Sequence, residues 1–154
     1  MRRIDREITE IKDIEGILDR GFVCHLGLVD GVRAYIVPMN YAYDNMSIYL
    51  HCAGEGKKLD LLRANNNVCF EIDINENDIA RSGDEPCEWG TKFESVIGFG
   101  KAVFLESPKD KCLGLNAIVS RYAKRTYEFP ESEVEATIVI KILIEEITGK
   151  RAES

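Results

Sequence analysis

The sequence predicts a mainly β fold, a small antiparallel barrel with α-helices at its rim. Apolar runs of strand length recur along the chain, and the turn pairs Asp30-Gly31 and Asp44-Asn45 separate the first of them. Asp-Gly tolerates the positive φ angles of a tight turn, so these runs are expected to form a meander of antiparallel strands. Six strands with so much meander, and three segments with helical spacing, favour such a barrel.

In the first half of the chain, a helix is expected between Thr9 and Gly21, because Ile14 and Leu18 recur at helical spacing. Threonine suits the start of such a helix and glycine its end. A short second helix is expected over 57–65, closed by three asparagines. Between the two helices we expect three strands, FVCHLGLV (22–29), RAYIVPMNYAY (33–43) and SIYLHCA (47–53).

In the second half, Ser107 is a helix cap followed by Pro108 at the first helical position, which predicts a third helix. Gly98 and Gly100 lie two apart in a strand, so they face the same side and leave room for a close neighbour. The polar stretch 75–90 is expected to be a loop. The remaining strands are VCFEIDI (68–74), ESVIGFGKAVFLE (94–106) and ATIVIKILIEEI (136–147).

Composition limits the class of protein. With 154 residues, 45% of them hydrophobic and 31% charged, the chain is expected to form one soluble domain over 1–154. The net charge of -7 argues against a nucleic-acid partner, which favours a broad cationic face. No apolar run approaches the roughly 20 residues that cross a bilayer, and the start lacks the core of a signal peptide. We therefore expect a cytoplasmic protein without a membrane segment.

The stretch IYLHCAGEGKKLDLLRAN (48–65) predicts an anion site. Gly54 and Gly56 let a ligand approach the backbone, and the helix that follows points unpaired amides and its positive dipole end at the loop. Lys57 and Lys58 add two cations there, which suits a phosphate dianion. The alternative is a solvated lysine pair on an ordinary loop. By strand alternation, Tyr49 and His51 share a face opposite the core.

The segment VPMNYAY (37–43) adds features that suit a planar heteroaromatic ligand. Pro38 cannot donate to a strand ladder and so marks a sheet edge or a bulge. Asn40 offers an amide and Tyr41 an aromatic face, and a planar ligand needs both edge hydrogen bonds and an apolar surface.

Together, VPMNYAYD, IYLHCAGEGKKLDLLRANNNVCFEID, SVIGFGKA and EEITGK resemble the FMN-binding split barrels related to pyridoxamine 5'-phosphate oxidase, most of all the 5-nitroimidazole-resistance (Nim-type) group. The resemblance extends from about Phe22 to Lys150. It implies a six-stranded split barrel and a homodimer with FMN at the interface. The residues that it implies at the cofactor are Val37, Pro38, Met39, Asn40, His51, Cys52, Ala53, Lys57, Lys58 and Ser95.

The resemblance also implies an FMN-dependent oxidoreductase, in which FMN takes a hydride from NAD(P)H and passes electrons to a small acceptor such as a nitroaromatic or quinone. His51 is the candidate catalytic residue, as a donor of a proton or hydrogen bond. The chain departs from the oxidase in reading Gly56-Lys57-Lys58 at the phosphate motif and in lacking the oxidase's C-terminal arginine and histidine motif. The alternative function is a non-catalytic flavin- or haem-binding module, with His51 as a haem ligand.

Other residues have two interpretations each. Trp89 is a lid over the ligand or an anchor of its loop to the core. Lys150 reaches the partner subunit's phosphate or lies in solvent. His25 faces outward or is structural, and we expect no metal site because adjacent Cys and His residues of a strand point to opposite faces.

Overall fold

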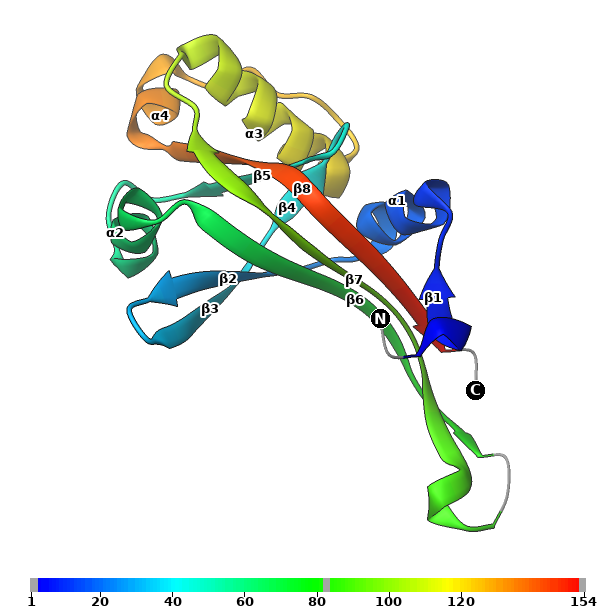
Figure 1. The fold of residues 1–154 in the computed structure, drawn as a ribbon. Helices are drawn as coiled ribbons and strands as arrows, with labels where there is room; N and C mark the ends of the chain where they lie inside the picture. Colours follow the sequence, from blue (N-terminus) through cyan, green and yellow to red (C-terminus); the bar gives the residue numbers. More distant parts are fainter. Residues whose placement is uncertain (1–2, 82–83, 153–154) are drawn as a thin grey trace.

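Strands β1 to β8 form one antiparallel sheet that curls into a half-barrel (Figure 1). The computed structural model describes residues 3–81 and 84–152, and only the backbone of residues 76–81. The strands are β1 (Glu7–Ile8), β2 (Cys24–Asp30), β3 (Arg33–Met39), β4 (Tyr41–Tyr43), β5 (Ser47–Cys52), β6 (Asn67–Arg81), β7 (Trp89–Phe104) and β8 (Ile138–Ala152). The helices are η1 (Ile4–Arg6), α1 (Ile11–Arg20), α2 (Lys57–Ala64), η2 (Pro86–Glu88), α3 (Pro108–Ala123) and α4 (Glu131–Ala136).

The strand order β3-β2-β6-β7-β8-β5-β4, with β1 beside β8, shows where the barrel is split. β3 and β4 stand at opposite ends of this order, yet only Asn40 separates them along the chain. The chain therefore passes from one sheet edge to the other at Asn40, and no ladder joins the two edges among the described pairings.

The mainly β class is confirmed, but the predicted count of six strands is too low: the described residues form eight. One extra strand is β1, whose Glu7 and Ile8 pair with Lys150 and Gly149. The other arises because the run 33–43 divides into β3 and β4. Neither feature has a local signal, since a two-residue strand depends on its partner and the division on sheet curvature.

The predicted loop over 75–90 is wrong for most of its length. β6 continues to Arg81 and β7 begins at Trp89, with a register shift between Asn75 and Ile79. Figure 1 shows this hairpin projecting away from the rest of the sheet. A hairpin that projects from the main core needs no apolar alternation, and β6 and β7 continue their backbone pairing along it, from Ile79 opposite Thr91 to Arg81 opposite Trp89. The short helix α4 was also not predicted from the sequence.

The main core lies inside the curled sheet, and α1 and α2 pack their apolar faces onto it. It includes Leu26, Phe70 and Ile142, each at most 1% exposed. The expected close approach at the β7 glycines is confirmed: a Cβ atom at Gly98 would overlap the Phe70 ring, and one at Gly100 would overlap the Leu143 carbonyl.

Helix α3 covers the other side of β5 and builds two smaller apolar clusters there, one around Tyr49 and one around Val139. Its predicted start is confirmed, because the Ser107 side chain accepts a hydrogen bond from the Asp110 backbone N–H at 3.1 Å. Gly114 faces the sheet, where a Cβ atom would lie 2.8 Å from Val139 Cγ1 and 3.1 Å from Tyr49 Cδ1. The missing side chain thus lets α3 sit close to β5 and β8.

No helix within 3–81 and 84–152 combines the length and apolar character that a membrane crossing requires.

Candidate functional site

The start of α2 has the form that the sequence predicts for an anion site. Gly56 caps the helix with φ 129° and ψ 159°, a conformation that favours glycine, and no side chain caps it. The first backbone bonds to the Gly56 carbonyl come from Leu59 and Asp60. The N–H groups of the first helical residues point out of the helix and are available to a bound anion.

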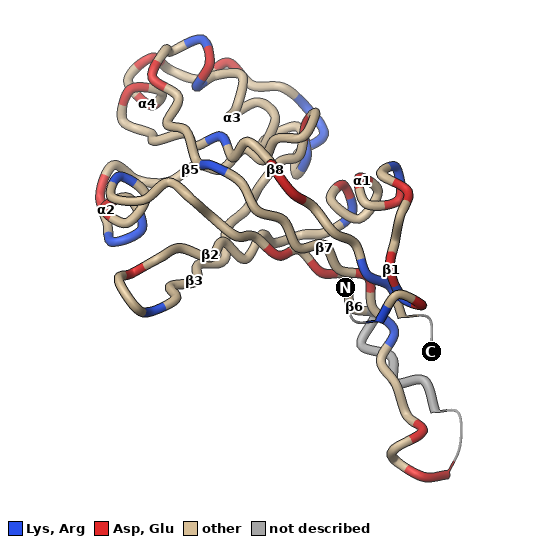
Figure 2. The backbone as a smooth tube through the Cα atoms, viewed as in Figure 1, with Lys and Arg blue, Asp and Glu red and all other residues tan. Residues whose placement is uncertain are grey.

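The two lysines at this helix start differ in their partners (Figure 2, where the start of α2 is blue). Lys57 Nζ lies 2.6 Å from Asp30 Oδ2 and 4.9 Å from the centre of the Tyr35 ring. The hydrogen bond to Asp30 raises the pKa of Lys57. Lys57 is therefore already paired with a carboxylate at the end of β2.

Lys58 makes no ion pair or hydrogen bond with another residue in the described part of the chain. It is half-buried and acts electrostatically on the end of β5. Its charge is the second cause, after burial, of the lowered pKa of His51. It also lowers the pKa of Cys52, although burial raises that pKa overall. Lys58 is thus the lysine of the pair whose charge is not neutralised by a neighbouring carboxylate.

His51 lies at the end of β5, opposite Val139 of β8. The expected alternation is confirmed: Leu50 belongs to the main core, and Tyr49 packs under α3. His51 is exposed as a residue, yet the protein on one side of its ring still desolvates the ring, which makes no hydrogen bond with any other described residue. Because its pKa is lowered, the imidazole is neutral at pH 7 and keeps one N–H donor and one acceptor nitrogen.

The segment 37–40 runs along a sheet edge, as Pro38 indicates, because among the described residues β3 pairs only with β2. Val37 and Met39 face the core, while Pro38 and Asn40 are exposed on the other side. Cys52 packs against the main core, and Ala53 is exposed in the turn before α2. One chain therefore offers an exposed sheet edge from Pro38 to Asn40 and a separate helix start.

Ser95 is not brought to the lysines within one chain. It is half-buried on β7, opposite Asp73 and Lys150. The β7 residue whose strand partner lies closest to α2 in the sequence is Lys101, which pairs with Asn67 just after that helix. Lys101 lies six residues beyond Ser95, and six residues of a strand span roughly 20 Å. Lys150, which was expected near a partner's phosphate or in solvent, has its Nζ 5.3 Å from the centre of the Phe93 ring.

A second group of polar residues was not found from the sequence. His25 Nδ1 lies 3.0 Å from Glu71 Oε2, and with Asp73 these residues place donor atoms within 4.8 Å of one another. His25 and Glu71 are 46 positions apart and meet only through the pairing of β2 with β6. No spacing signal in the sequence could have found this cluster.

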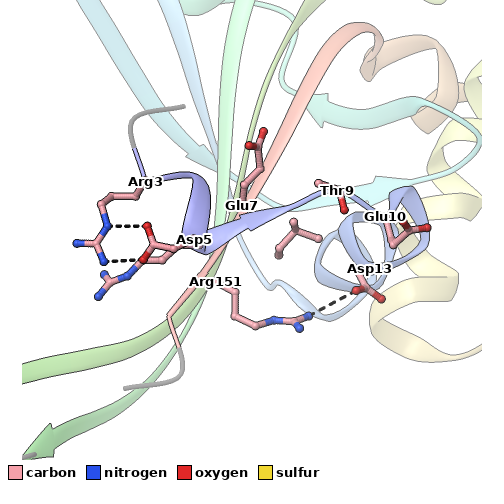
Figure 3. A pocket seen from close by; sticks show the side chains of 9 residues that line it. Arg3, Asp5, Glu7, Thr9, Glu10, Asp13 and Arg151 are labelled. Carbon is pink, nitrogen blue, oxygen red and sulfur yellow. Dashed lines mark hydrogen bonds and ion pairs between the residues drawn. The ribbon is translucent and has the colours of Figure 1, made fainter.

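The predicted site residues do not line the polar pocket in Figure 3, which has a volume of about 550 Å³. Two ion pairs lie within its lining: Arg3 Nη2 is 2.7 Å from Asp5 Oδ2, and Arg151 Nη2 is 4.0 Å from Asp13 Oδ2. Arg151 Nε also donates to Glu94 at 2.9 Å. The two Arg151 contacts connect β8 to α1 and to β7, whereas the Arg3–Asp5 pair lies within the N-terminal segment.

A curled antiparallel sheet that is open at Asn40, with the glycine-capped helix α2 at one end, defines a split-barrel protein. A family model described as pyridoxamine 5'-phosphate oxidase matches residues 10–151, so the chain belongs to that family. No curated protein sequence matches the chain.

Solved structures share the fold over nearly the whole chain. The crystal structure of a proposed 5-nitroimidazole antibiotic resistance protein from Bacteroides thetaiotaomicron has a TM-score of 0.85 and 30% identity, covering 94% of this chain and 86% of that one. The flavocytochrome Anf3 from Azotobacter vinelandii has a TM-score of 0.83 at 20% identity, covering 100% and 72%. The FAD and haem binding protein from Mycobacterium smegmatis has a TM-score of 0.83 at 16% identity, covering 97% and 74%.

Proposed function

We propose that the protein binds a flavin mononucleotide whose phosphate lies at the start of α2. The observation that carries this proposal is the open, glycine-capped helix start beside Lys58, a half-buried lysine without a carboxylate partner among the described residues. A phosphate accepts hydrogen bonds from such amides and is stabilised by the helix dipole and the ammonium group. Membership of the pyridoxamine 5'-phosphate oxidase family supports a flavin as the cofactor.

The remaining site residues fit the other parts of FMN. The exposed edge at Pro38 and Asn40 offers backbone groups and an amide to the ring system. In the sequence, His51, Cys52 and Ala53 follow the segment proposed to bind the ring and precede the lysines proposed to bind the phosphate. When bound, the flavin supplies the redox chemistry, and the protein supplies positioning and electrostatics.

We further propose that the protein acts as a homodimer. The outer face of the sheet carries an exposed apolar patch that a soluble monomer would rarely display. Register places these residues on one face, because Phe99 is opposite Cys69, Cys69 opposite Gly27, and Gly27 opposite Ile36. The outer apolar patch consists of Val29, Ile36, Ile97, Phe99, Val103 and Leu143.

A second copy on this patch would explain why Ser95 is far from the lysines of its own chain. Ser95 lies on the same face of β7 as Ile97 and Phe99, two and four residues away. In the proposed dimer, the Ser95 side chain of one subunit contacts the flavin held by α2 of its partner.

The proposed reaction oxidises NAD(P)H and reduces a small acceptor such as a nitroaromatic or quinone by way of the flavin. The neutral His51 imidazole can donate its N–H to the acceptor, because the lowered pKa keeps the ring uncharged at pH 7. Arginine and histidine residues comparable to the oxidase's C-terminal substrate motif are lacking, so a pyridoxamine phosphate substrate is disfavoured.

The visible spectrum of the protein purified in air tests flavin binding. A flavin doublet, with FMN released on denaturation, is the expected result. A colourless protein that takes up no added FMN would overturn the proposal.

The second candidate function is a non-catalytic flavin- or haem-binding module. It is favoured by one specific observation, the free imidazole nitrogens of His51 among the described residues, since a haem iron takes such a ligand. A Soret band in place of the flavin doublet would support the haem version. Turnover of NAD(P)H with and without a nitroaromatic separates an enzyme from a flavin reservoir.

A further inference from the structure

A cavity of about 190 Å³ lies between α3, α4 and the end of β5, beside His51. Its apolar wall comes from Leu115, Ile118 and Val119 of α3 and from Phe129 before α4. Leu115 and Ile118 are buried, and the other two residues are half-buried. The cavity therefore has an aliphatic side and one aromatic ring, a lining that suits an apolar planar molecule.

The remaining lining is polar and comes from His51, Glu133 and Thr137. Thr137 Oγ1 donates to the Glu133 carbonyl at 2.7 Å, so this hydroxyl proton is in use. In contrast, the His51 ring and the Glu133 carboxylate make no hydrogen bond or ion pair with any residue in 3–81 or 84–152. Two polar groups with unused hydrogen-bonding capacity thus border an apolar cavity.

The walls of this cavity are held in place without a ligand. Gly114 lets α3 pack closely on Tyr49 and Val139, and Val139 is the strand partner of His51. Lys111 Nζ of α3 donates to the carbonyls of Val134 and Glu135 in α4, at 3.2 and 3.3 Å. These contacts hold α4 beside α3, and the cavity between them is present without a ligand.

Volume and charge select the occupant. An engineered apolar cavity of about 150 Å³ holds benzene, so about 190 Å³ accommodates one ring with a small substituent. The Glu133 carboxylate disfavours an anionic ligand, since like charges repel across a short distance. We propose that this cavity binds a neutral, single-ring aromatic molecule, with its ring against α3 and Phe129 and its hydrogen-bonding substituent at His51.

This inference extends the proposed function, because His51 belongs to both sites. Its redox meaning, that the ring molecule is the electron acceptor, rests on the proposed flavin site. Ring binding itself rests only on the cavity, so the two can be tested apart.

Titration of the purified protein with simple probes, followed by NMR at the backbone amides of Val119 and Thr137, tests the cavity. Benzyl alcohol is expected to bind, and both benzoate and 1-naphthalenemethanol are expected to bind at least 10-fold more weakly. Equal binding of benzoate, equal binding of the two-ring alcohol, or shifts confined to other parts of the molecule would overturn the proposal.

Variants locate the site. Val119→Phe fills the cavity and should weaken benzyl alcohol binding at least 10-fold, whereas Leu113→Phe, at an exposed position of the same helix, should not. Glu133→Gln changes an exposed residue and should raise benzoate affinity about 5-fold relative to benzyl alcohol. If Val119→Phe does not fold, the Glu133→Gln result decides, and an unchanged benzoate affinity contradicts the proposal.

The flavin content of each variant separates the two hypotheses. Val119→Phe is expected to keep the FMN absorbance of the parent. If the parent protein binds benzyl alcohol but no flavin, the cavity proposal stands and the redox proposal is overturned. A parent protein that binds FMN but none of the three probes would end the cavity proposal alone.

Discussion

At the scale of single residues, two adjacent lysines have different environments. Lys57 is paired with Asp30 at 2.6 Å, and Lys58 has no such partner in the described chain. A phosphate would compete with Asp30 for Lys57 but would find Lys58 available. A hydrogen bond to a charged group contributes about 1.5–3 kcal/mol, which corresponds to roughly tenfold or more in affinity.

We therefore expect Lys58→Ala to weaken FMN binding roughly tenfold or more and Lys57→Ala by less than about threefold. Quenching of FMN fluorescence on flavin-free protein, at constant ionic strength, measures both. Lys12→Ala is the control, because it removes the same charge from the exposed face of α1. Equal losses of FMN affinity in the two single variants would show that the ion pair with Asp30 does not keep Lys57 from the phosphate. No loss in the double variant would remove the phosphate site.

The pKa of His51 provides a second test at this scale. Burial and then the charge of Lys58 lower this pKa below 6.5. Removing Lys58 removes a repulsion of the protonated ring, so Lys58→Ala should raise the pKa without restoring it fully, since burial remains. A pH titration of the His51 ring protons by NMR measures the shift. Lys57→Ala should leave the pKa unchanged, and a pKa that does not move in Lys58→Ala would contradict this view.

The sign of the stability change follows from the same shift. The pKa of His51 is lower in the folded state than in the unfolded state. As pH falls from above 6.5 toward the folded pKa, the unfolded state therefore binds more protons than the folded state, and the free energy of unfolding decreases. His51 thus lowers stability on the acid side only, and His51→Gln should flatten the fall in urea stability through that window. A steeper fall in the variant would show that the protonated ring is stabilised instead.

At the scale of elements, α3 depends on Gly114. A side chain there would enter the space of Val139 and Tyr49, and overpacking costs about 1–3 kcal/mol. Gly114→Leu should lower the free energy of unfolding by about that amount, as measured in urea. Gly16 of α1 is the matched control, because a Cβ atom there meets nothing within 4 Å. Gly16→Ala should stabilise by up to about 1 kcal/mol, and a stable Gly114→Leu would show that α3 can shift.

The elements also show what the sequence could predict. The start of α3 follows from Ser107-Pro108, which is a local signal, and the structure has it. The short helix expected over 57–65 is also present, as α2. In the candidate site, the lysine pair at a helix start was likewise local. The pairing of Lys57 with Asp30 and of His25 with Glu71 was not local, because the first depends on how α2 packs against β2 and the second on the pairing of β2 with β6. For the same reason, sequence periodicity could not reveal the division at Asn40.

At the scale of the whole molecule, the outer apolar patch and the position of Ser95 point to the same arrangement. Phe99 is 51% exposed and Ile36 is 64% exposed, and register places them in one row across the sheet. A second copy that covers this row would bury both and carry its own Ser95 to the partner's α2. Dimerisation and flavin binding should then be coupled.

Phe99→Glu places a charge at the centre of this patch and should convert the dimer to a monomer in sedimentation velocity. Because Ser95 would no longer reach a partner's flavin, FMN content should fall in parallel with dimer content. Val32→Glu is the matched control: Val32 is 103% exposed in the turn between β2 and β3, outside the patch. A Phe99→Glu monomer with full FMN content would show that one chain completes the flavin site by itself, and Ser95 would then have no part in it.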